Sequence, residues 1–355
     1  MTTRSVVTST IRYVYDLVYF YPDGHAAHAQ PGHPERPERI EAIVETLDQA
    51  GLWKPFPQLN PLDIPEPVLL GVHTRRHLET IEGVSATGGR IDSDTYLTPA
   101  TWDLALRAAG GACSTAAAVW ERSAARGFAL CRPPGHHATP DRAMGFCLIN
   151  NIAVAAEYLL REHGAEKLAV IDLDLHHGNG TQDIFYERPD VLFISTHQHP
   201  LYPGTGMLRE TGRGPGAGTT VNIPLPPSSG DNAFSTAVET IILPALARFE
   251  PEMLLVSAGV DVHWRDPLGH LQLSAAGYHA AVAAMAAFAD NHCTGRLALF
   301  LEGGYDLAGG SACAFGAASA LLAHPFTDPL GPAPHPETER WLDILVQARK
   351  IHGLD

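Results

Sequence analysis

The sequence predicts an α/β protein in which helices cover both faces of a parallel sheet. Short apolar runs rich in Leu, Val and Ile recur along the chain, as in strands that are buried on both sides. Segments with helical periodicity lie between these runs. The chain has 355 residues, 45% hydrophobic and 18% charged, and its composition shows no internal boundary, so we expect one domain over residues 1–355.

Five apolar runs carry the strand prediction. They lie at residues 128–131, 168–173, 191–195, 253–257 and 297–301. Most are short and continuous, as is typical of buried parallel strands. Their alternation with helical segments favours a parallel sheet over an antiparallel one.

The helices are predicted from apolar spacing and from their end signals. Pro37 begins a helix whose Ile40, Ile43 and Leu47 share one face, and Gly51 ends it. Ser274 is an expected N-cap. Three further helices are expected at residues 151–163, at 232–249 with a kink at Pro244, and at 274–290.

The chain is also rich in loop-forming residues. Glycine and proline number 33 and 28 among 355 residues, and many of them fall at 202–218 and 224–230. Long ordered loops over a rigid sheet often build a functional site. A proline-rich connector at about 325–336 leads to a last expected helix at about 337–351.

Charge and cysteine usage exclude several classes of protein. Lys and Arg number 24 against 39 Asp and Glu, a net charge of −15, which disfavours nucleic-acid binding. Five scattered cysteines form no C-x-x-C pair, so neither disulfides nor a thiolate zinc site is expected, as in a reducing compartment.

The chain is expected to work away from membranes. Its longest apolar run, 280–289, is far shorter than the roughly 20 residues of a membrane helix, and the N-terminus lacks a signal-peptide pattern. We therefore expect a cytoplasmic protein that binds neither membranes nor nucleic acid. Its oligomeric state stays open, homo-oligomers included.

The most informative segment begins where the run 168–173 meets acidic residues and histidines. Asp172, Asp174 and His176 are expected on one face of an extended chain, at the strand end where α/β sheets bind ligands. Carboxylates buried there would repel one another unless a cation lay among them. Asp261, after a second strand, completes an Asp–His–Asp set. Such donors suit zinc, iron(II) or cobalt, and three ligands leave a position for water or substrate.

Two further strand ends carry groups suited to acid–base chemistry. His136 and His137 follow the run 128–131 in a loop that prolines and a glycine shape. Neighbouring imidazoles can differ in pKa and so divide proton-transfer roles. Tyr305 follows two glycines after the run 297–301, where its phenol could donate a hydrogen bond to an oxyanion.

Together these motifs resemble the zinc-dependent histone deacetylase family, which includes bacterial acetoin-utilisation proteins and acetylpolyamine amidohydrolases. The motifs are GHPERPER at 32–39, RPPGHHA at 132–138, DLDLHHGNGTQ at 172–182, PGTG at 203–206, SAGVD at 257–261 and LEGGYD at 301–306. GHPERPER and Asn179 resemble the class II branch. The resemblance implies an arginase-like fold with a mostly parallel eight-stranded sheet, helices on both faces and long loops at the carboxyl ends of the strands.

The resemblance also implies roles for individual residues. Its implied metal ligands are Asp174, His176 and Asp261, and its implied catalytic residues are His136, His137, Tyr305, Asp172 and Asn179. Asp172 would hold His136. Asn179 would hold His137, where class I members carry aspartate.

The substrate pocket and a second cation site are implied in the same way. Gly145, Phe146, Tyr202, Leu268 and Asp94 match positions around an acyl-lysine tunnel, and Asp172, Asp174, His176 and Ser195 match a structural potassium site. Polyamine-selective relatives often carry glutamate near the position of Leu268. Arg39 resembles an arginine that lines an internal channel in the family. The alternative is that Arg39 forms a salt bridge on the surface.

The function that the resemblance implies is hydrolysis of an acetyl or acyl group from the ε-amine of lysine in proteins or peptides. Three alternatives stay open. The substrate could be an acetylpolyamine or another small acetylated amine. The enzyme could be an arginase-type binuclear manganese hydrolase. The chain could also be a non-catalytic module that binds acyl-lysine.

Overall fold

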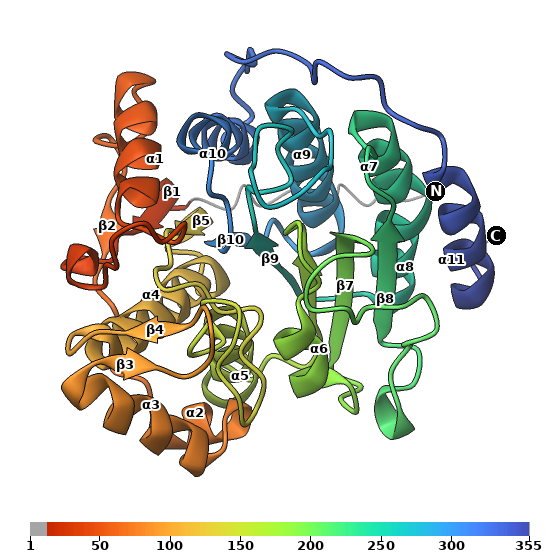
Figure 1. The fold of residues 1–355 in the computed structure, drawn as a ribbon. Helices are drawn as coiled ribbons and strands as arrows, with labels where there is room; N and C mark the ends of the chain where they lie inside the picture. Colours follow the sequence, from red (N-terminus) through yellow and green to blue (C-terminus); the bar gives the residue numbers. More distant parts are fainter. Residues whose placement is uncertain (1–12, 355) are drawn as a thin grey trace, which may run out of the picture.

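Eight parallel strands form the centre of the computed structural model, which describes residues 13–354 (Figure 1). In spatial order they are β2 (Gln58–Leu59), β1 (Tyr15–Phe20), β5 (Ala124–Ala129), β10 (Leu297–Leu301), β9 (Met253–Ala258), β6 (Leu168–Asp172), β7 (Val191–Gln198) and β8 (Thr220–Leu225). A separate antiparallel ribbon pairs β3 (Gly89–Arg90) with β4 (Tyr96–Leu97). The central sheet is thus wholly parallel, where the sequence predicted a mostly parallel one.

The five predicted strands are present, with shifted ends in four of them. The run 297–301 coincides with β10, whereas β5 begins at Ala124 and β7 continues to Gln198. Three strands of the central sheet, β1, β2 and β8, were not predicted, nor was the β3–β4 ribbon. β8 was missed because Asn222 and Pro224 interrupt its apolar pattern, so the expected loop 224–230 was placed two residues too early. Proline is tolerated there because β8 is an edge strand.

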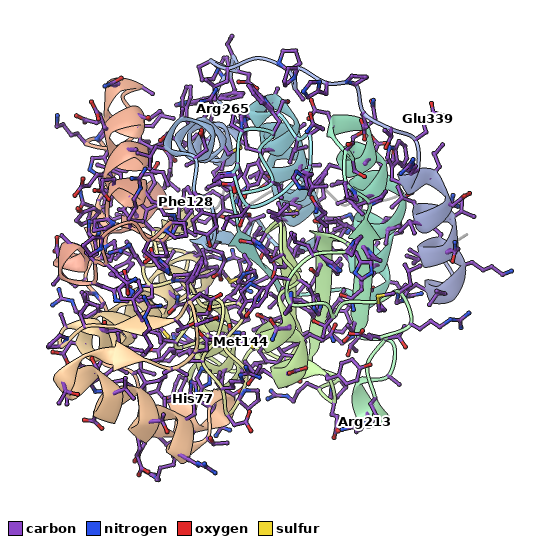
Figure 2. All side chains as sticks on the ribbon, viewed as in Figure 1. His77, Phe128, Met144, Arg213, Arg265 and Glu339 are labelled. Atoms are coloured by element: carbon purple, nitrogen blue, oxygen red, sulfur yellow. The ribbon has the colours of Figure 1, made fainter. Side chains whose placement is uncertain are left out.

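Helices cover the sheet in two layers (Figure 1). One layer contains α1 (Glu38–Gln49), α7 (Asp231–Ala237), α8 (Leu243–Phe249), α9 (Ala275–His292), α10 (Leu307–Leu321) and α11 (Trp341–His352). The other contains α2 (Glu66–Val72), α3 (Arg75–Thr87), α4 (Thr101–Trp120) and α5 (Asn151–Glu162). Each layer encloses its own apolar cluster against the sheet. Figure 2 shows Phe128, which is fully buried, among the packed side chains, whereas Arg213 and Glu339 lie at the periphery.

Most predicted helices begin and end close to the expected residues. Ser274 caps α9, because its hydroxyl accepts the N–H of Gly277 at 3.0 Å. The expected kink at Pro244 appears as a π-helical turn, Val238–Ile242, just before α8. The last helix begins at Trp341 and not near 337.

Two of the helices that escaped prediction are buried on nearly all sides. The helices α4 and α10 have almost no polar face, so they lack the periodicity that reveals a surface helix. No helix among residues 13–354 has the length and apolar character that crossing a bilayer requires. The N-terminal residues 1–12, which entered the signal-peptide argument, lie outside the described residues.

A buried ion-pair network attaches the N-terminal loops to the centre of the sheet. The Glu35 carboxylate is fully buried and accepts hydrogen bonds from Arg132 Nε at 2.7 Å and from Arg39 Nη1 at 3.0 Å. Arg132 also donates to the carbonyls of His25 and His28. Burial alone would raise the pKa of Glu35, but the two guanidinium groups outweigh it and lower that pKa. Arg39 is itself buried, and its ion pair with Glu35 lies inside the protein. The interpretation of Arg39 as part of a surface salt bridge is therefore wrong.

We expect Glu35→Gln to destabilise the protein by about 3–5 kcal/mol, because it leaves two buried guanidinium groups without their carboxylate. The measurement is denaturant unfolding at neutral pH. Asp48→Asn is the control, since it removes the exposed ion pair with Lys54 and should cost less than about 1 kcal/mol.

The same variant should change the response to acid. The lowered pKa of Glu35 means that its stabilisation is complete above the ordinary value of 4.5 and is lost as the pH falls through the folded-state pKa. Glu35→Gln should therefore flatten this part of the stability profile. An unchanged profile, or equal losses for the two variants, would contradict the role of the network.

Candidate active site

Four neighbouring strands supply the predicted functional residues. The adjacent strands β5, β10, β9 and β6 are parallel, so their carboxyl ends meet at one edge of the sheet. The loop after β5 carries His136 and His137, and Asp174 follows β6. Asp261 follows β9, and Tyr305 follows β10. All five side chains are buried.

The chain bends sharply after β6. Asp172 ends the strand, and its Oδ1 accepts the N–H of Asp174 at 3.0 Å. Asp174 Oδ1 in turn accepts the N–H of His176 at 2.8 Å. The expected strand alternation through His176 was therefore wrong, because the two aspartates turn the backbone. Asp174 and His176 converge on Asp261 through these turns, whereas Asp172 faces His136.

Asp174, His176 and Asp261 form a cluster with the chemistry of a metal site. One ligand atom from each lies within 4.8 Å of the others, and His176 Nδ1 is 3.2 Å from Asp174 Oδ1 and 3.3 Å from Asp261 Oδ2. Asp261 Oδ2 is buried without a hydrogen-bond donor. Burial and the Asp174 charge raise the pKa of Asp261 to about 7. A divalent cation would satisfy the orphaned oxygen and stabilise both carboxylates, so the donor set fits such an ion.

The two histidines differ in their partners and in their pKa. His136 Nδ1 is 3.0 Å from Asp172 Oδ2, and His137 Nδ1 is 2.7 Å from Asn179 Oδ1. Burial opposes a charged His136, but Asp174 and Asp172 raise its pKa well above 6.5. Burial and its histidine neighbours lower the pKa of His137 well below 6.5. Neutral His137 donates Nδ1–H to the amide oxygen, which leaves Nε2 free to accept a proton.

Glu302 is a site residue that sequence reasoning missed. Its carboxylate accepts hydrogen bonds from the backbone N–H groups of Gly135 and His136, at 2.7 and 3.1 Å, and from Ser257 Oγ at 3.1 Å. It thereby ties the histidine loop to β9. The available signal was a charged residue directly after the apolar run of β10. Burial raises the pKa of Glu302 to about 7.

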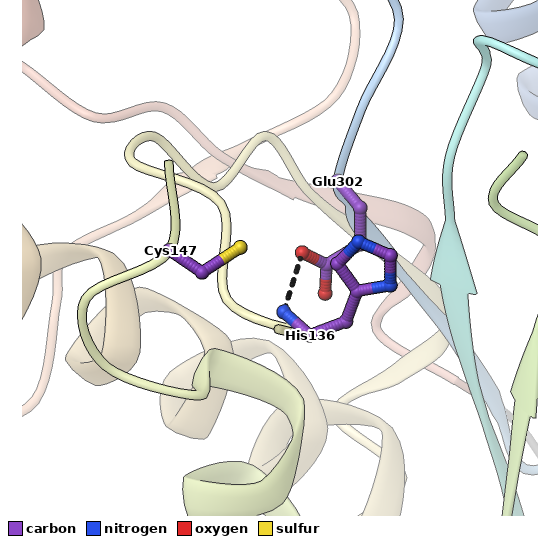
Figure 3. Close-up of side chains that lie close together, drawn as sticks. All are labelled: His136, Cys147 and Glu302. Atoms are coloured by element: carbon purple, nitrogen blue, oxygen red, sulfur yellow. Dashed lines mark hydrogen bonds between the residues drawn. The ribbon is translucent and has the colours of Figure 1, made fainter. Parts of the chain in front are cut away.

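Cys147 lies beside this carboxylate (Figure 3). Burial raises the pKa of the Cys147 thiol well above 9, so the sulfur is a neutral packing group rather than a thiolate ligand. His136 is engaged with Asp172, so His136, Cys147 and Glu302 make a poor second metal site. This group shares no residue with the Asp–His–Asp cluster. Within residues 13–354 the geometry thus supports a mononuclear centre and gives no bridging carboxylate for a binuclear one.

The segment that carries Tyr305 is held closely against the metal ligands. Gly303 N–H donates to Asp174 Oδ2 at 2.9 Å, and a Cβ at Gly303 would collide with Asp174 and Asp261. Arg39 donates to the carbonyl of Gly304 at 2.5 Å, and its guanidinium carbon lies 4.9 Å from the centroid of the Tyr305 ring. Burial raises the pKa of Tyr305 well above 10, so its phenol stays protonated and can donate a hydrogen bond.

A cavity of about 260 Å³ leads to this centre. It is lined by Asp94, His137, Gly145, Phe146, His176, Leu201, Tyr202, Leu268 and Tyr305. Tyr202 is 39% exposed, whereas Tyr305 and His176 are only 9% and 8% exposed, so the cavity runs from an exposed aromatic mouth to a buried polar base. All five predicted pocket residues line it. Predicted Ser195 lies elsewhere, on β7 beside Asp172, and its Oγ is 2.9 Å from His197 Nδ1.

The aromatic walls are positioned by neighbouring rings and by one glycine. Phe146 contacts Tyr305 edge-to-face with centroids 5.7 Å apart, and Tyr202 contacts His137 in the same way at 5.2 Å. Gly145 has a φ of +55°, and a Cβ there would collide with His137. Only glycine therefore allows the wall to lie this close to the histidine.

Comparison with known proteins points to one family. The model of the histone deacetylase domain matches residues 33–321. A probable deacetylase of Archaeoglobus fulgidus is 48% identical over 68% of this chain and 67% of its own length. Histone deacetylase 10, chloroplastic, of Oryza sativa is 39% identical over 93% and 79%, and a histone deacetylase-like amidohydrolase of Pseudomonas aeruginosa is 43% identical over 67% and 63%.

A solved structure is similar over almost the whole chain. The crystal structure of the HDA15 HD domain superposes with a TM-score of 0.87 at 34% identity, covering 96% of this chain and 94% of that one. The predicted fold class is thereby confirmed. The residue roles within the site stay predictions.

We expect the chain to bind one zinc ion, and Asp261→Asn to lose most of it, because one carboxylate of the cluster is removed. The measurement is metal content by mass spectrometry after loading and dialysis. We expect about one equivalent for the wild type and less than about a tenth for the variant. Asp190→Asn, at the amino end of β7, should retain the metal. Two equivalents in the wild type, or full retention in Asp261→Asn, would contradict the mononuclear site.

Proposed function

This chain belongs to the histone deacetylase family, and we propose that it is a metal-dependent hydrolase that removes acetyl groups from the ε-amine of lysine in proteins or peptides. One observation carries the proposal: His137, His176 and Tyr305 form the buried end of a cavity that Phe146 and Tyr202 also line. A slender apolar chain would pass along these rings, and its terminal amide would meet the polar base. The family itself supports an acetylated substrate.

The metal that we propose is Zn²⁺, with Fe²⁺ or Co²⁺ as alternatives. Asp174, His176 and Asp261 would hold it, since their donors cluster and Asp261 Oδ2 lacks another partner. When bound, such a cation polarises the amide carbonyl and lowers the pKa of a water molecule. The absence of a thiolate from this donor set leaves the three metals open.

The protein groups would then divide the proton transfers. Water adds to the amide carbon, and the C–N bond of the tetrahedral species breaks. His137 Nε2 would accept the proton of the water and deliver it to the leaving amine, since Nδ1 is engaged by Asn179. His136, held in its charged form by Asp174 and Asp172, would stabilise the developing negative charge. The Tyr305 phenol would donate a hydrogen bond to the oxyanion.

We also propose a structural K⁺ site at Asp172, Asp174, His176 and Ser195. Asp172 and Ser195 are direct partners across β6 and β7, so the oxygen atoms of both residues are available on neighbouring strands where β6 ends. Oxygen atoms are the ligands that alkali and other hard cations prefer. Such an ion would stabilise the bend that carries the metal ligands.

A small acetylated amine is the second candidate substrate. Asp94 lines the cavity, and the neighbouring Asp92 carboxylate interacts with it, so the mouth could attract a second ammonium group. Leu268 favours acetyl-lysine, because an apolar side chain stands where a cation-binding carboxylate would be needed. A non-catalytic acyl-lysine module would require the histidines and Tyr305 to be idle, and metal-loaded protein without turnover would support that alternative.

The partner and compartment proposals rest on broader properties. The net charge of −15 supports cationic partners and disfavours nucleic acid. Five free, buried cysteines support a reducing compartment, and we propose the cytoplasm. The rice relative is named chloroplastic.

Tyr305→Phe should lower kcat on an acetyl-lysine peptide by about 10²–10³-fold, because one oxyanion donor is lost. KM should change little. The experiment measures initial rates with zinc-loaded protein and checks metal content in parallel. Tyr278→Phe is the matched control, because it removes a buried phenol on α9 that has no hydrogen-bond partner. Full activity of Tyr305→Phe would contradict the proposed mechanism.

We expect a higher kcat/KM for an acetyl-lysine peptide than for an acetylated polyamine, because Leu268 cannot pair with a second ammonium. The two substrates are to be compared with the same metal-loaded preparation. Leu268→Glu should shift the ratio toward the polyamine. A wild-type preference for the polyamine would replace the lysine proposal with the second candidate.

A further inference from the structure

Asp266 is a buried carboxylate that joins two loops of the cavity. Its side chain is 6% exposed, and Oδ2 accepts the backbone N–H groups of Tyr305 at 2.6 Å and Asp306 at 3.2 Å. Oδ1 accepts the N–H of Leu268 at 3.0 Å. The N–H of Asp266 donates to the carbonyl of His263 at 2.8 Å, so the backbone that carries the carboxylate is itself held in a hydrogen-bonded turn. One side chain thus holds the backbone of two cavity-lining residues, Leu268 and Tyr305.

The backbone before Tyr305 needs such an anchor. Gly303 and Gly304 precede it, and Gly304 has a φ of +128°, which side chains with a Cβ rarely allow. Because glycine has no Cβ, the backbone here has few steric restraints of its own. The Gly304 carbonyl is held by Arg39, and the next N–H, that of Tyr305, is held by Asp266. The peptide unit between Gly304 and Tyr305 is therefore clamped on both of its polar atoms. Its orientation determines where the Tyr305 ring points.

We propose that Asp266 is a positioning residue that fixes Tyr305 in the orientation for oxyanion binding and couples it to the wall formed by Leu268. This inference rests on the proposed function only for the role of Tyr305. Asp266 does not line the cavity, so it acts through the backbone that it holds. A charged acceptor is suited to this, because one carboxylate can accept three N–H groups at once.

Asp266→Asn tests the proposal with little change in volume. An asparagine has one acceptor oxygen, so its amide N–H₂ must face either Leu268 or the Tyr305 and Asp306 N–H groups. We expect kcat on the acetyl-lysine peptide to fall at least tenfold while KM stays within about threefold. In a Tyr305→Phe background the same substitution should cost less than about threefold, because the group that it positions is already gone.

Asp328→Asn is the matched control. Asp328 also accepts three backbone N–H groups, from Leu330 and Gly331 on Oδ1 and from Ala276 on Oδ2, but none of these residues lines the cavity. It should lower the thermal unfolding midpoint without lowering kcat. Equal kcat losses in the two variants, or a full loss from Asp266→Asn in the Tyr305→Phe background, would show a general structural role and overturn the proposal. Unchanged kcat in Asp266→Asn would overturn it as well.

A crystal structure of Asp266→Asn separates this proposal from the proposed function. We expect the Tyr305 ring to be displaced or disordered in the variant and ordered in the wild type. A wild type that turns over no acylated amine would contradict the proposed function. The position of Tyr305 in the crystal structure of Asp266→Asn would still test the positioning role of Asp266. An unmoved, ordered Tyr305 would overturn the positioning role. Should Asp266→Asn fail to fold, Asp266→Glu, which retains both oxygens, must restore folding with a lowered kcat.

Discussion

The structure depends on keeping several carboxylates buried at the meeting point of four strand ends. Asp172, Asp174, Asp261 and Glu302 are each at most 1% exposed. Charges in such a place are tolerated only with close donors or counter-ions. Asp172 is paired with His136, Asp174 accepts a backbone N–H group, and Glu302 accepts the Ser257 hydroxyl. Asp261 Oδ2 has no hydrogen-bond donor. The sheet thereby creates a place where a cation is stabilising and where a histidine can be held charged.

A recurring device is a carboxylate that binds the backbone of another segment. Glu302 holds the histidine loop, Asp174 holds Gly303, and Asp266 holds Tyr305 and Leu268. The bonds of Glu302 and Asp174 connect the carboxyl end of one strand to a neighbouring loop, and the bond from Tyr305 to Asp266 connects two loops, so the loops need no regular secondary structure to be rigid. Long loops at a sheet edge can then present side chains with the precision that catalysis requires.

Much of the site was predictable because its residues directly follow apolar runs. Asp174, Asp261 and Tyr305 each stand a few residues after a strand core, and parallel strands bring such positions together. The prediction was wrong about the path between Asp172 and His176, since aspartate side chains turn the backbone there. It also missed β1 and β8, and helices such as α4 whose burial removes the usual periodicity.

The amino-acid sequence was enough to predict the fold class, the order of the motifs and the kinds of ligand that could gather at one edge of the sheet. These follow from local patterns, because apolar runs form buried strands and charged residues after them must lie at the strand ends. The strand order, which makes β5, β10, β9 and β6 neighbours, could be seen only in the folded chain. The tertiary structure also shows which carboxylates hold the loop backbones, since Glu302 binds the histidine loop and Asp266 binds the backbone of Tyr305. Hydrogen bonds between residues far apart in the chain leave no periodic trace in a single sequence.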